Sequence, residues 1–133
     1  MKSRRIIYWF ATALTAFVFL SGGANELAHP GYLMQGMAHL GYPAYFVTIL
    51  GVWKILGGIT ILIPRTPLLK EWAYAGMFFD LTGASASHAS SGDPILKVAT
   101  PLIIVIIVIV SWALRPGSRK VLVNTTDGST VVV

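Results

Sequence analysis

Two side chains of opposite charge lie inside apolar stretches of this sequence. Asp80 opens 80-DLTGASASH-88, and Lys54 lies inside 45-YFVTILGVWKILGGITILI-63. Ionisable groups in such surroundings are unfavourable unless they are paired, and they often mark routes for protons, ions or ligands. We therefore treat Lys54 and Asp80 as a candidate charge pair. It either lines a cavity or proton route, or it only clamps two helices together.

A second group of polar residues lies at the ends of the apolar stretches. It comprises Glu26, His29, His88 and Asp93. Imidazole and carboxylate groups exchange protons and form hydrogen bonds with polar head groups. These four residues could bind the head group of a quinone or another polar ligand, or they could only cap loops. Their spacing matches no HExxH-type zinc motif, so we expect no metal site.

Several classes of chemistry lack the residues that they need. The chain has no cysteine, which excludes iron–sulfur clusters, thiolate-bound metals and disulfide relays built from this chain. Neither 21-SGGAN-25 nor Gly57-Gly58 has the spacing of a phosphate-binding loop. The net charge of +5 is spread between the apolar stretches, whereas nucleic-acid binding favours one basic soluble face. No nucleic-acid partner is expected.

The composition indicates a lipid environment. Of the 133 residues, 55% are hydrophobic and 11% are charged, whereas a soluble domain is about 25% charged. A chain this short cannot bury so much apolar surface in an aqueous core. We expect the lipid bilayer of the cell membrane to be its surroundings.

Four segments have the length of roughly 20 mostly apolar residues that a membrane span requires. They are residues 6–24, 45–63, 72–90 and 98–114. Helices are expected, because lipid obliges backbone amides to find partners within their own segment. The predicted fold class is all-α, an integral membrane four-helix bundle with antiparallel up-down connections. Residues 1–116 would form this four-span membrane domain, and residues 117–133 a short cytoplasmic tail.

The basic residues predict the orientation of the spans. Lysines and arginines precede the first segment, separate the second from the third and follow the fourth, while the other two connections hold only Lys97. Short basic loops remain in the cytoplasm, so a multi-pass protein with both termini cytoplasmic is predicted. An inner aromatic belt would then comprise Tyr8, Trp9, Trp72, Tyr74 and Trp112. The alternative is that residues 1–24, beginning MKSRR, are a cleaved signal peptide.

Helical geometry predicts that Lys54 and Asp80 meet. Counted from the inner side at 1.5 Å per residue, Asp80 lies roughly 12 Å deep and Lys54 roughly 15 Å deep. Small residues surround both charges: Gly51, Gly57 and Gly58 near Lys54, and Ala73, Gly76, Gly83, Ala84 and Ser87 near Asp80. Because small residues allow membrane helices to approach closely, we expect these two helices to pack tightly around the pair.

Long stretches of the sequence resemble the DoxX-like family of small four-helix membrane proteins. They are 39-HLGYPAYFVTILGVWKILGGITILIPR-65, 70-KEWAYAGMFFDLTGASASH-88, 92-GDP-94 and 112-WALRP-116, and the resemblance covers nearly all of residues 8–116. It implies a four-helix membrane bundle and a loose link to quinone-coupled respiratory or sulfur redox systems. It supplies no established catalytic residues.

The leading functional hypothesis is an accessory subunit of a quinone-linked membrane redox system, without a metal centre of its own. Its partners would be quinone and other membrane redox subunits, and no intrinsic cofactor is expected. One alternative is a small transporter or binder of an apolar molecule that uses a cavity at Lys54 and Asp80. Another is a structural or assembly subunit. The sequence leaves open whether the protein is an enzyme.

Overall fold

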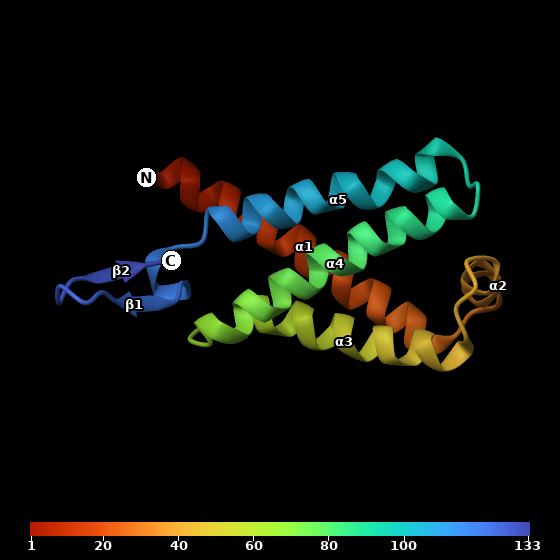
Figure 1. The fold of residues 1–133 in the computed structure, drawn as a ribbon, viewed down its shortest axis with the longest axis horizontal. Helices are drawn as coiled ribbons and strands as arrows, with labels where there is room; N and C mark the ends of the chain where they lie inside the picture. The colour runs from red at the N-terminus through yellow and green to blue at the C-terminus, as the bar shows by residue number, and fades with distance from the viewer.

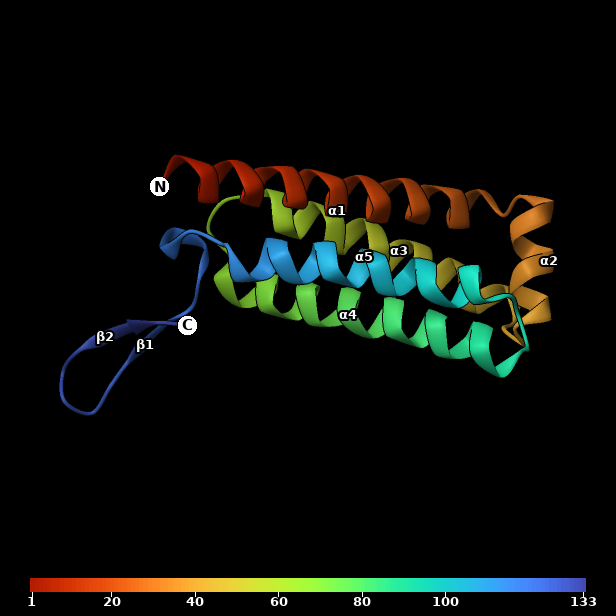
Figure 2. The same ribbon diagram turned by 90° about the horizontal axis from the view of Figure 1, so that it is seen from above.

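The computed structural model describes residues 1–133 and contains five α-helices. They are α1 (Lys2–Ala28), α2 (Gly31–His39), α3 (Ala44–Leu62), α4 (Pro67–Ser90) and α5 (Ile95–Ala113). The four long helices lie side by side, and the short α2 lies across one end of them (Figures 1 and 2). The all-α class agrees with the prediction, but the number of helices is five rather than four, because part of the first long connection folds as α2.

Three of the helices, α1, α3 and α5, are long and apolar enough to cross a membrane. Helix α4 contains 24 residues, but its composition is more polar, with Lys70, Glu71, Asp80 and His88 along its length. By length and composition the structure therefore supports three of the four predicted spans. The region predicted as a third span is helical, but it falls short in hydropathy.

Proline residues mark where the helices begin. Pro30, Pro43 and Pro94 directly precede α2, α3 and α5, and Pro67 is the first residue of α4. The first turn of a helix does not need the N–H that proline lacks. At the C-terminal end of α1, His29 adopts a left-handed conformation with φ of 52°, and the chain turns there toward α2.

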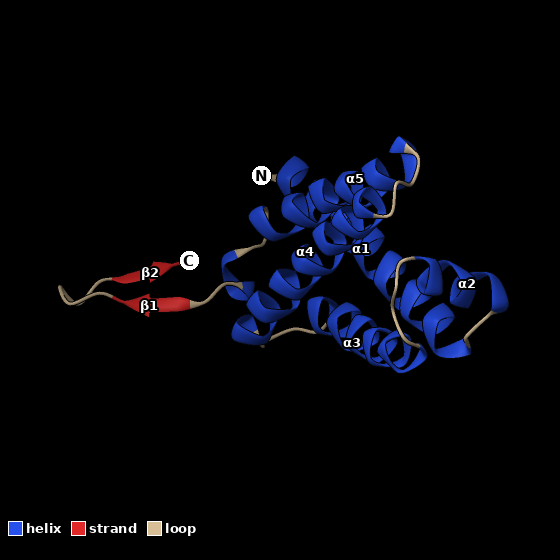
Figure 3. Cartoon of the chain, turned by 45° about the vertical axis from the view of Figure 1, so that its right-hand side comes forward, coloured by secondary structure: helices blue, strands red, loops and turns tan.

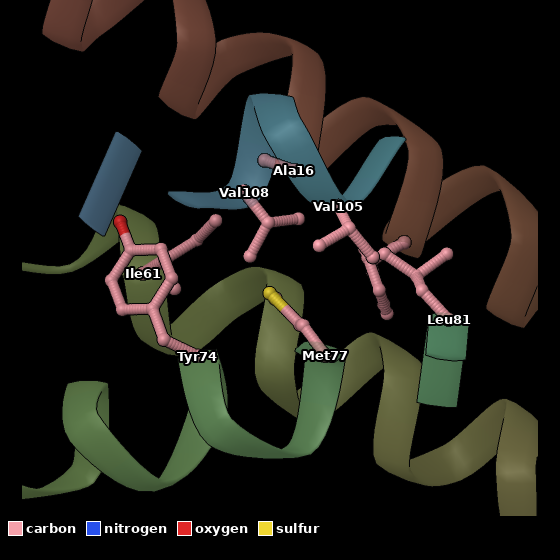
Figure 4. Close-up of a cluster of buried hydrophobic side chains, with 8 residues drawn as sticks. Ala16, Ile61, Tyr74, Met77, Leu81, Val105 and Val108 are labelled. Carbon is pink, nitrogen blue, oxygen red and sulfur yellow. The ribbon is translucent and has the colours of Figure 1, made fainter. Parts of the chain in front are cut away.

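The apolar core is shared by all four long helices. It comprises Ala16 and Phe19 of α1, Ile61 of α3, Tyr74, Met77 and Leu81 of α4, and Val105 and Val108 of α5, most of them visible in Figure 4. Helix α4 therefore packs into the same core as the three more apolar helices. Because Met77 and Leu81 face this core, the intervening Asp80 is held at its edge.

Glycine residues allow α1 and α3 to approach closely. A Cβ atom on Gly23 would lie 2.8 Å from the carbonyl oxygen of Gly51, and one on Gly58 would lie 2.8 Å from Leu20. The prediction that the small residues of α3 pack against α4 is wrong for Gly51 and Gly58, which contact α1. On α4, a Cβ atom on Gly76 would meet no atom within 4 Å. The side of α4 that carries Gly76 is therefore not in close contact with another helix.

Two basic side chains cap the end of α3. Lys70, which is 1% exposed, donates a hydrogen bond to the carbonyl of Thr60 at 2.7 Å and another to Ile63. Arg119 donates to the carbonyl of Ile61 at 3.0 Å. The last carbonyls of a helix have no donor within the helix and attract cations. Basic residues that the sequence analysis used only to orient the chain therefore also terminate a helix.

The inner aromatic belt is smaller than predicted. Tyr8 and Tyr74 are 0% and 4% exposed, so they belong to the interior. Trp9, Trp72 and Trp112 remain exposed. The hydroxyl groups of Tyr8 and Tyr74, which would suit a membrane interface, are enclosed between the helices.

The C-terminal region contains a 3₁₀ turn, η1 (Gly117–Arg119), and a hairpin of β1 (Leu122–Asn124) and β2 (Thr130–Val132). The strands are antiparallel, with Val123 opposite Val131, and they extend beyond the helices (Figure 3). The hydroxyl groups of Thr125 and Ser129 lower the pKa of Asp127 in the turn to about 2. This hairpin was not predicted. It lies at the same end of the molecule as the N-terminus (Figure 1).

Candidate functional site

Lys54 contacts two carboxylates from two other helices. Its Nζ atom on α3 donates a hydrogen bond to Glu26 Oε1 on α1 at 2.5 Å, and it lies 3.7 Å from Asp80 Oδ2 on α4. The side chains of Glu26, Asp80 and Lys54 are 8%, 15% and 19% exposed. We call these three residues the charge triad. The structure brings Lys54 and Asp80 together and adds Glu26 as the closer partner of Lys54.

The approach of α1 to α3 explains why Glu26 reaches Lys54. A Cβ atom on Gly51 would lie 3.2 Å from the Cβ of Glu26, and one on Gly23 would lie 3.1 Å from the Cβ of Lys54. Each charged residue follows a glycine by three positions, Gly23 before Glu26 and Gly51 before Lys54, and therefore shares its helical face. This spacing was the signal in the sequence that could have assigned Glu26 to the triad.

A cavity of about 520 Å³ lies between α3 and α4, with Lys54 and Asp80 in its wall. Its remaining lining is mostly apolar and includes Trp53 from α3 and Trp72 and Phe79 from α4. The volume falls within the range of roughly 300–1,000 Å³ that is typical of small-molecule sites. The cavity therefore combines apolar walls with two charged groups.

The hydrogen bonding of the triad is incomplete. Lys54 donates its short hydrogen bond to Glu26, whereas its ion pair with Asp80 is longer, 3.7 Å, and is the one cationic contact of Asp80 within 4.0 Å. The second carboxylate oxygen of Glu26, Oε2, is buried without a partner. Buried carboxylates are normally paired and hydrogen-bonded. The triad thus has more acceptors than donors, and Asp80 presents its acceptors to the cavity.

The predicted outer group is divided among three places. Asp93 lies between two histidines, with Oδ2 2.6 Å from His88 Nδ1 and Oδ1 2.9 Å from His39 Nε2. The hydrogen bond from His88 is the main cause that lowers the pKa of Asp93. His29 bonds to Thr48 Oγ1 at 2.9 Å instead. The contact between His39 and Asp93 joins α2 to the connection between α4 and α5, and that between His29 and Thr48 joins the end of α1 to α3.

The structure therefore does not bring Glu26, His29, His88 and Asp93 together in a single pocket. Glu26 is buried on the inward face of α1. His29 directly follows the helix and has a left-handed backbone conformation, so its side chain points to different neighbours. His39, which was not among the four predicted residues, takes a place beside His88 and Asp93. No group of three or more His, Asp or Glu side chains is arranged to hold a metal ion.

Comparison with known proteins gives one match. The chain matches the DoxX-like family over residues 10–111, a stretch that contains the whole charge triad and the lining of the cavity. No curated protein and no solved structure matches the chain. The family match covers well over half of the 133 residues. The chain therefore belongs to the DoxX-like family.

Proposed function

We propose that this protein is a multi-pass membrane protein that binds an apolar small molecule with a polar head group between α3 and α4. The observation that carries the proposal is the cavity of about 520 Å³, which places Lys54 and Asp80 in an otherwise mostly apolar wall. Apolar pockets with a few convergent polar groups are the usual form of small-molecule sites. The family and the three apolar helices support a membrane location.

The ligand would enter from the lipid. Trp53, Trp72 and Phe79, which line the cavity, are 67%, 65% and 70% exposed, so the cavity opens at the surface that acyl chains would cover. A molecule dissolved in the bilayer could place its apolar body against these rings. Its head group would then lie beside the polar atoms of Lys54 and Asp80.

The proposed topology has α4 as a fourth span and both termini in the cytoplasm. Its 24 residues would extend about 36 Å, and Lys54 reduces the unfavourable free energy of placing Asp80 in lipid. The N-terminus and residues 117–133 lie at one end of the molecule (Figure 1). Both regions are basic, which supports a cytoplasmic position for that end.

A second candidate function is an accessory role in a quinone-linked redox system, with other membrane redox subunits as partners. A quinone is an apolar molecule whose carbonyl oxygens accept hydrogen bonds. The ammonium group of Lys54 has three donors, and it makes one hydrogen bond to a protein side chain, that to Glu26. A remaining donor in the cavity wall is the observation that favours a quinone.

The cavity can be tested with a matched pair of glycine substitutions on α4. A Cβ atom on either Gly76 or Gly83 meets no atom within 4 Å, but only Gly76 lines the cavity. Thermal unfolding in a neutral detergent would be measured with and without a short-chain quinone. The quinone should stabilise the wild type and Gly83→Phe, while Gly76→Phe, whose ring fills the cavity, should show no stabilisation. Equal stabilisation of all three proteins would contradict the proposal.

A role in a quinone-linked redox system predicts, in addition, an effect on the rate of quinone reduction. Supplied with an electron donor such as NADH, membranes that contain Gly76→Phe should reduce added quinone more slowly than membranes that contain Gly83→Phe at equal protein level. Equal rates, together with cavity-dependent stabilisation, would favour a binder without a redox role.

A further inference from the structure

The charge triad has a surplus of negative charge. Two carboxylates, Glu26 and Asp80, share one ammonium group, and Lys54 is the one cationic side chain within 4.0 Å of either carboxylate. The other buried cations are committed elsewhere, Lys70 to the end of α3 and Arg115 to Glu71. With its three groups ionised, the site therefore carries a net charge of −1.

The geometry assigns this surplus to Asp80. Lys54 lies 2.5 Å from Glu26 and 3.7 Å from Asp80. Lys54 and Glu26 therefore form a hydrogen-bonded pair with no net charge. Asp80 has only the longer contact with Lys54, and it lines the cavity, which Glu26 does not. A carboxylate in an apolar wall is unfavourable without a partner. Asp80 shares Lys54 with Glu26, so a closer cationic partner for Asp80 would come from what enters the cavity.

Lys54 also lies in the cavity wall, where Glu26 neutralises its charge, and the aromatic part of the wall favours positive charge. Phe19, Trp53, Trp72 and Phe79 are among the lining residues, and the faces of aromatic rings attract cations, tryptophan most strongly. An anion would meet a site that already holds one surplus negative charge. A neutral acceptor such as a quinone could bond to Lys54, but it would leave Asp80 with the longer contact to Lys54 as its one cationic contact.

We propose that the ligand of this cavity is a lipophilic monocation, a molecule with an apolar body and one positive charge, such as a substituted ammonium or phosphonium ion. Its charge pairs with Asp80, and its apolar body lies against the aromatic side chains between α3 and α4. This inference rests on the proposed function, in which the cavity is a ligand site, and it adds the charge of the ligand.

The test uses two ions of the same shape and opposite charge, tetraphenylphosphonium and tetraphenylborate. Each would be titrated into the full-length protein in a neutral detergent, with the unfolding temperature as the readout. Tetraphenylphosphonium should stabilise the wild type in a saturable way, and tetraphenylborate should not.

Asp80→Asn removes the surplus charge and leaves the pair of Glu26 and Lys54 intact. Its affinity for tetraphenylphosphonium should fall about tenfold or more, the loss expected when a partly buried charge loses its partner. Asp127→Asn is the matched control, because it makes the same change in the distant C-terminal hairpin. It should bind the phosphonium as the wild type does.

Two results would overturn the inference: equal stabilisation of the wild type by both ions, or an unchanged affinity in Asp80→Asn. Should Asp80→Asn fail to fold, the comparison of the two ions on the wild type and on Gly76→Phe still decides, because Gly76→Phe should lose the response to the phosphonium. A quinone response that depends on Gly76, without a preference between the ions, would leave the proposed function standing and refute the inference. Responses to all ligands that are independent of Gly76 would refute both.

Discussion

At the scale of single residues, the two carboxylates that share Lys54 are not equivalent. Glu26 is hydrogen-bonded to Lys54 at 2.5 Å and has an 8% exposed side chain, whereas Asp80 lies at 3.7 Å, is 15% exposed and lines the cavity. The closer and more buried carboxylate depends more on the ammonium group. Glu26 therefore stabilises Lys54 within the protein, and Asp80 remains available to a ligand.

Removal of Lys54 should consequently be far more harmful than removal of Asp80. Lys54→Met leaves two carboxylates without a counter-ion, and breaking a buried pair in this way typically destabilises by about 3–5 kcal/mol. Asp80→Asn should change the free energy of unfolding far less, because the closer pair of Glu26 and Lys54 remains intact. Added to Lys54→Met, Glu26→Gln should restore more stability than Asp80→Asn does. Denaturant unfolding in mixed micelles measures these differences, and equal restoration by the two second substitutions would contradict the unequal pairing.

The sequence was sufficient to bring Lys54 and Asp80 together, because depth along antiparallel helices follows from counting residues. The sequence did not assign Glu26 to this site, because a carboxylate two residues before the last residue of α1 resembles a group at the membrane interface. Only the close packing of Gly23 against Gly51 turns Glu26 inward toward Lys54. Such packing depends on which helices become neighbours, and counting residues along one helix does not determine its neighbours.

At the scale of the helices, glycine residues serve two opposite purposes. Gly23 and Gly51 bring the backbones of α1 and α3 into contact, whereas Gly57 and Gly76 line the cavity between α3 and α4. The sequence pattern predicted that consecutive helices would pack their small residues against each other. The order of helices in the chain does not determine which pair packs most closely.

Gly22 and Gly23 offer a direct comparison on adjacent positions of α1. A Cβ atom on Gly23 would lie 2.8 Å from a backbone oxygen, whereas one on Gly22 meets nothing within 4 Å. Gly23→Ala should therefore destabilise by about 1–3 kcal/mol through overpacking. Gly22→Ala should be neutral or stabilise by up to about 1 kcal/mol, because alanine favours the helix. The unfolding free energies of the two variants test this, and similar values would show that α1 and α3 are not held in close contact.

The four long helices could be predicted from the sequence, and α2 could not. Each predicted segment overlaps one long helix, because a continuous apolar run of this length has few other solutions in lipid. Helix α2, 31-GYLMQGMAH-39, contains nine residues, two of them glycine, so it has little intrinsic preference for a helix. Contacts such as the one between His39 and Asp93 stabilise it, and these contacts form only in the folded chain.

At the scale of the whole molecule, the outer surface of the helices is apolar and the basic residues gather at one end. Exposed large apolar side chains occur on all the long helices, for example Phe17, Trp53, Phe79 and Ile106. Patches of this extent mark contact with lipid or with partners. The composition predicted this surface correctly. It could not predict the ligand, because that depends on the few side chains that line one cavity.

The topology can be measured with single cysteines, because the chain has none of its own. Ser3, Gly31 and Ser118 would be replaced one at a time and treated on intact cells with a membrane-impermeant thiol reagent. Only the cysteine at position 31 should react, since α2 lies at the end opposite both termini (Figure 2). Lysed cells provide the control in which all three react. Reaction of position 118 on intact cells would contradict a cytoplasmic C-terminus.

Tryptophan fluorescence can test for a ligand site between α3 and α4. The chain contains four tryptophans. Two of them, Trp53 and Trp72, line the cavity, while Trp9 and Trp112 do not, and all four are exposed. One double variant, Trp9→Phe with Trp112→Phe, retains only the cavity pair, and its counterpart, Trp53→Phe with Trp72→Phe, retains only the other pair.

Both variants would be placed in lipid nanodiscs and titrated with an N-alkylpyridinium ion, an apolar molecule whose charged ring quenches tryptophan. The cavity pair should be quenched along a saturable binding curve. The other pair should show only the linear quenching that is caused by collisions in the lipid. Linear quenching of equal slope in both variants would contradict a ligand site between α3 and α4.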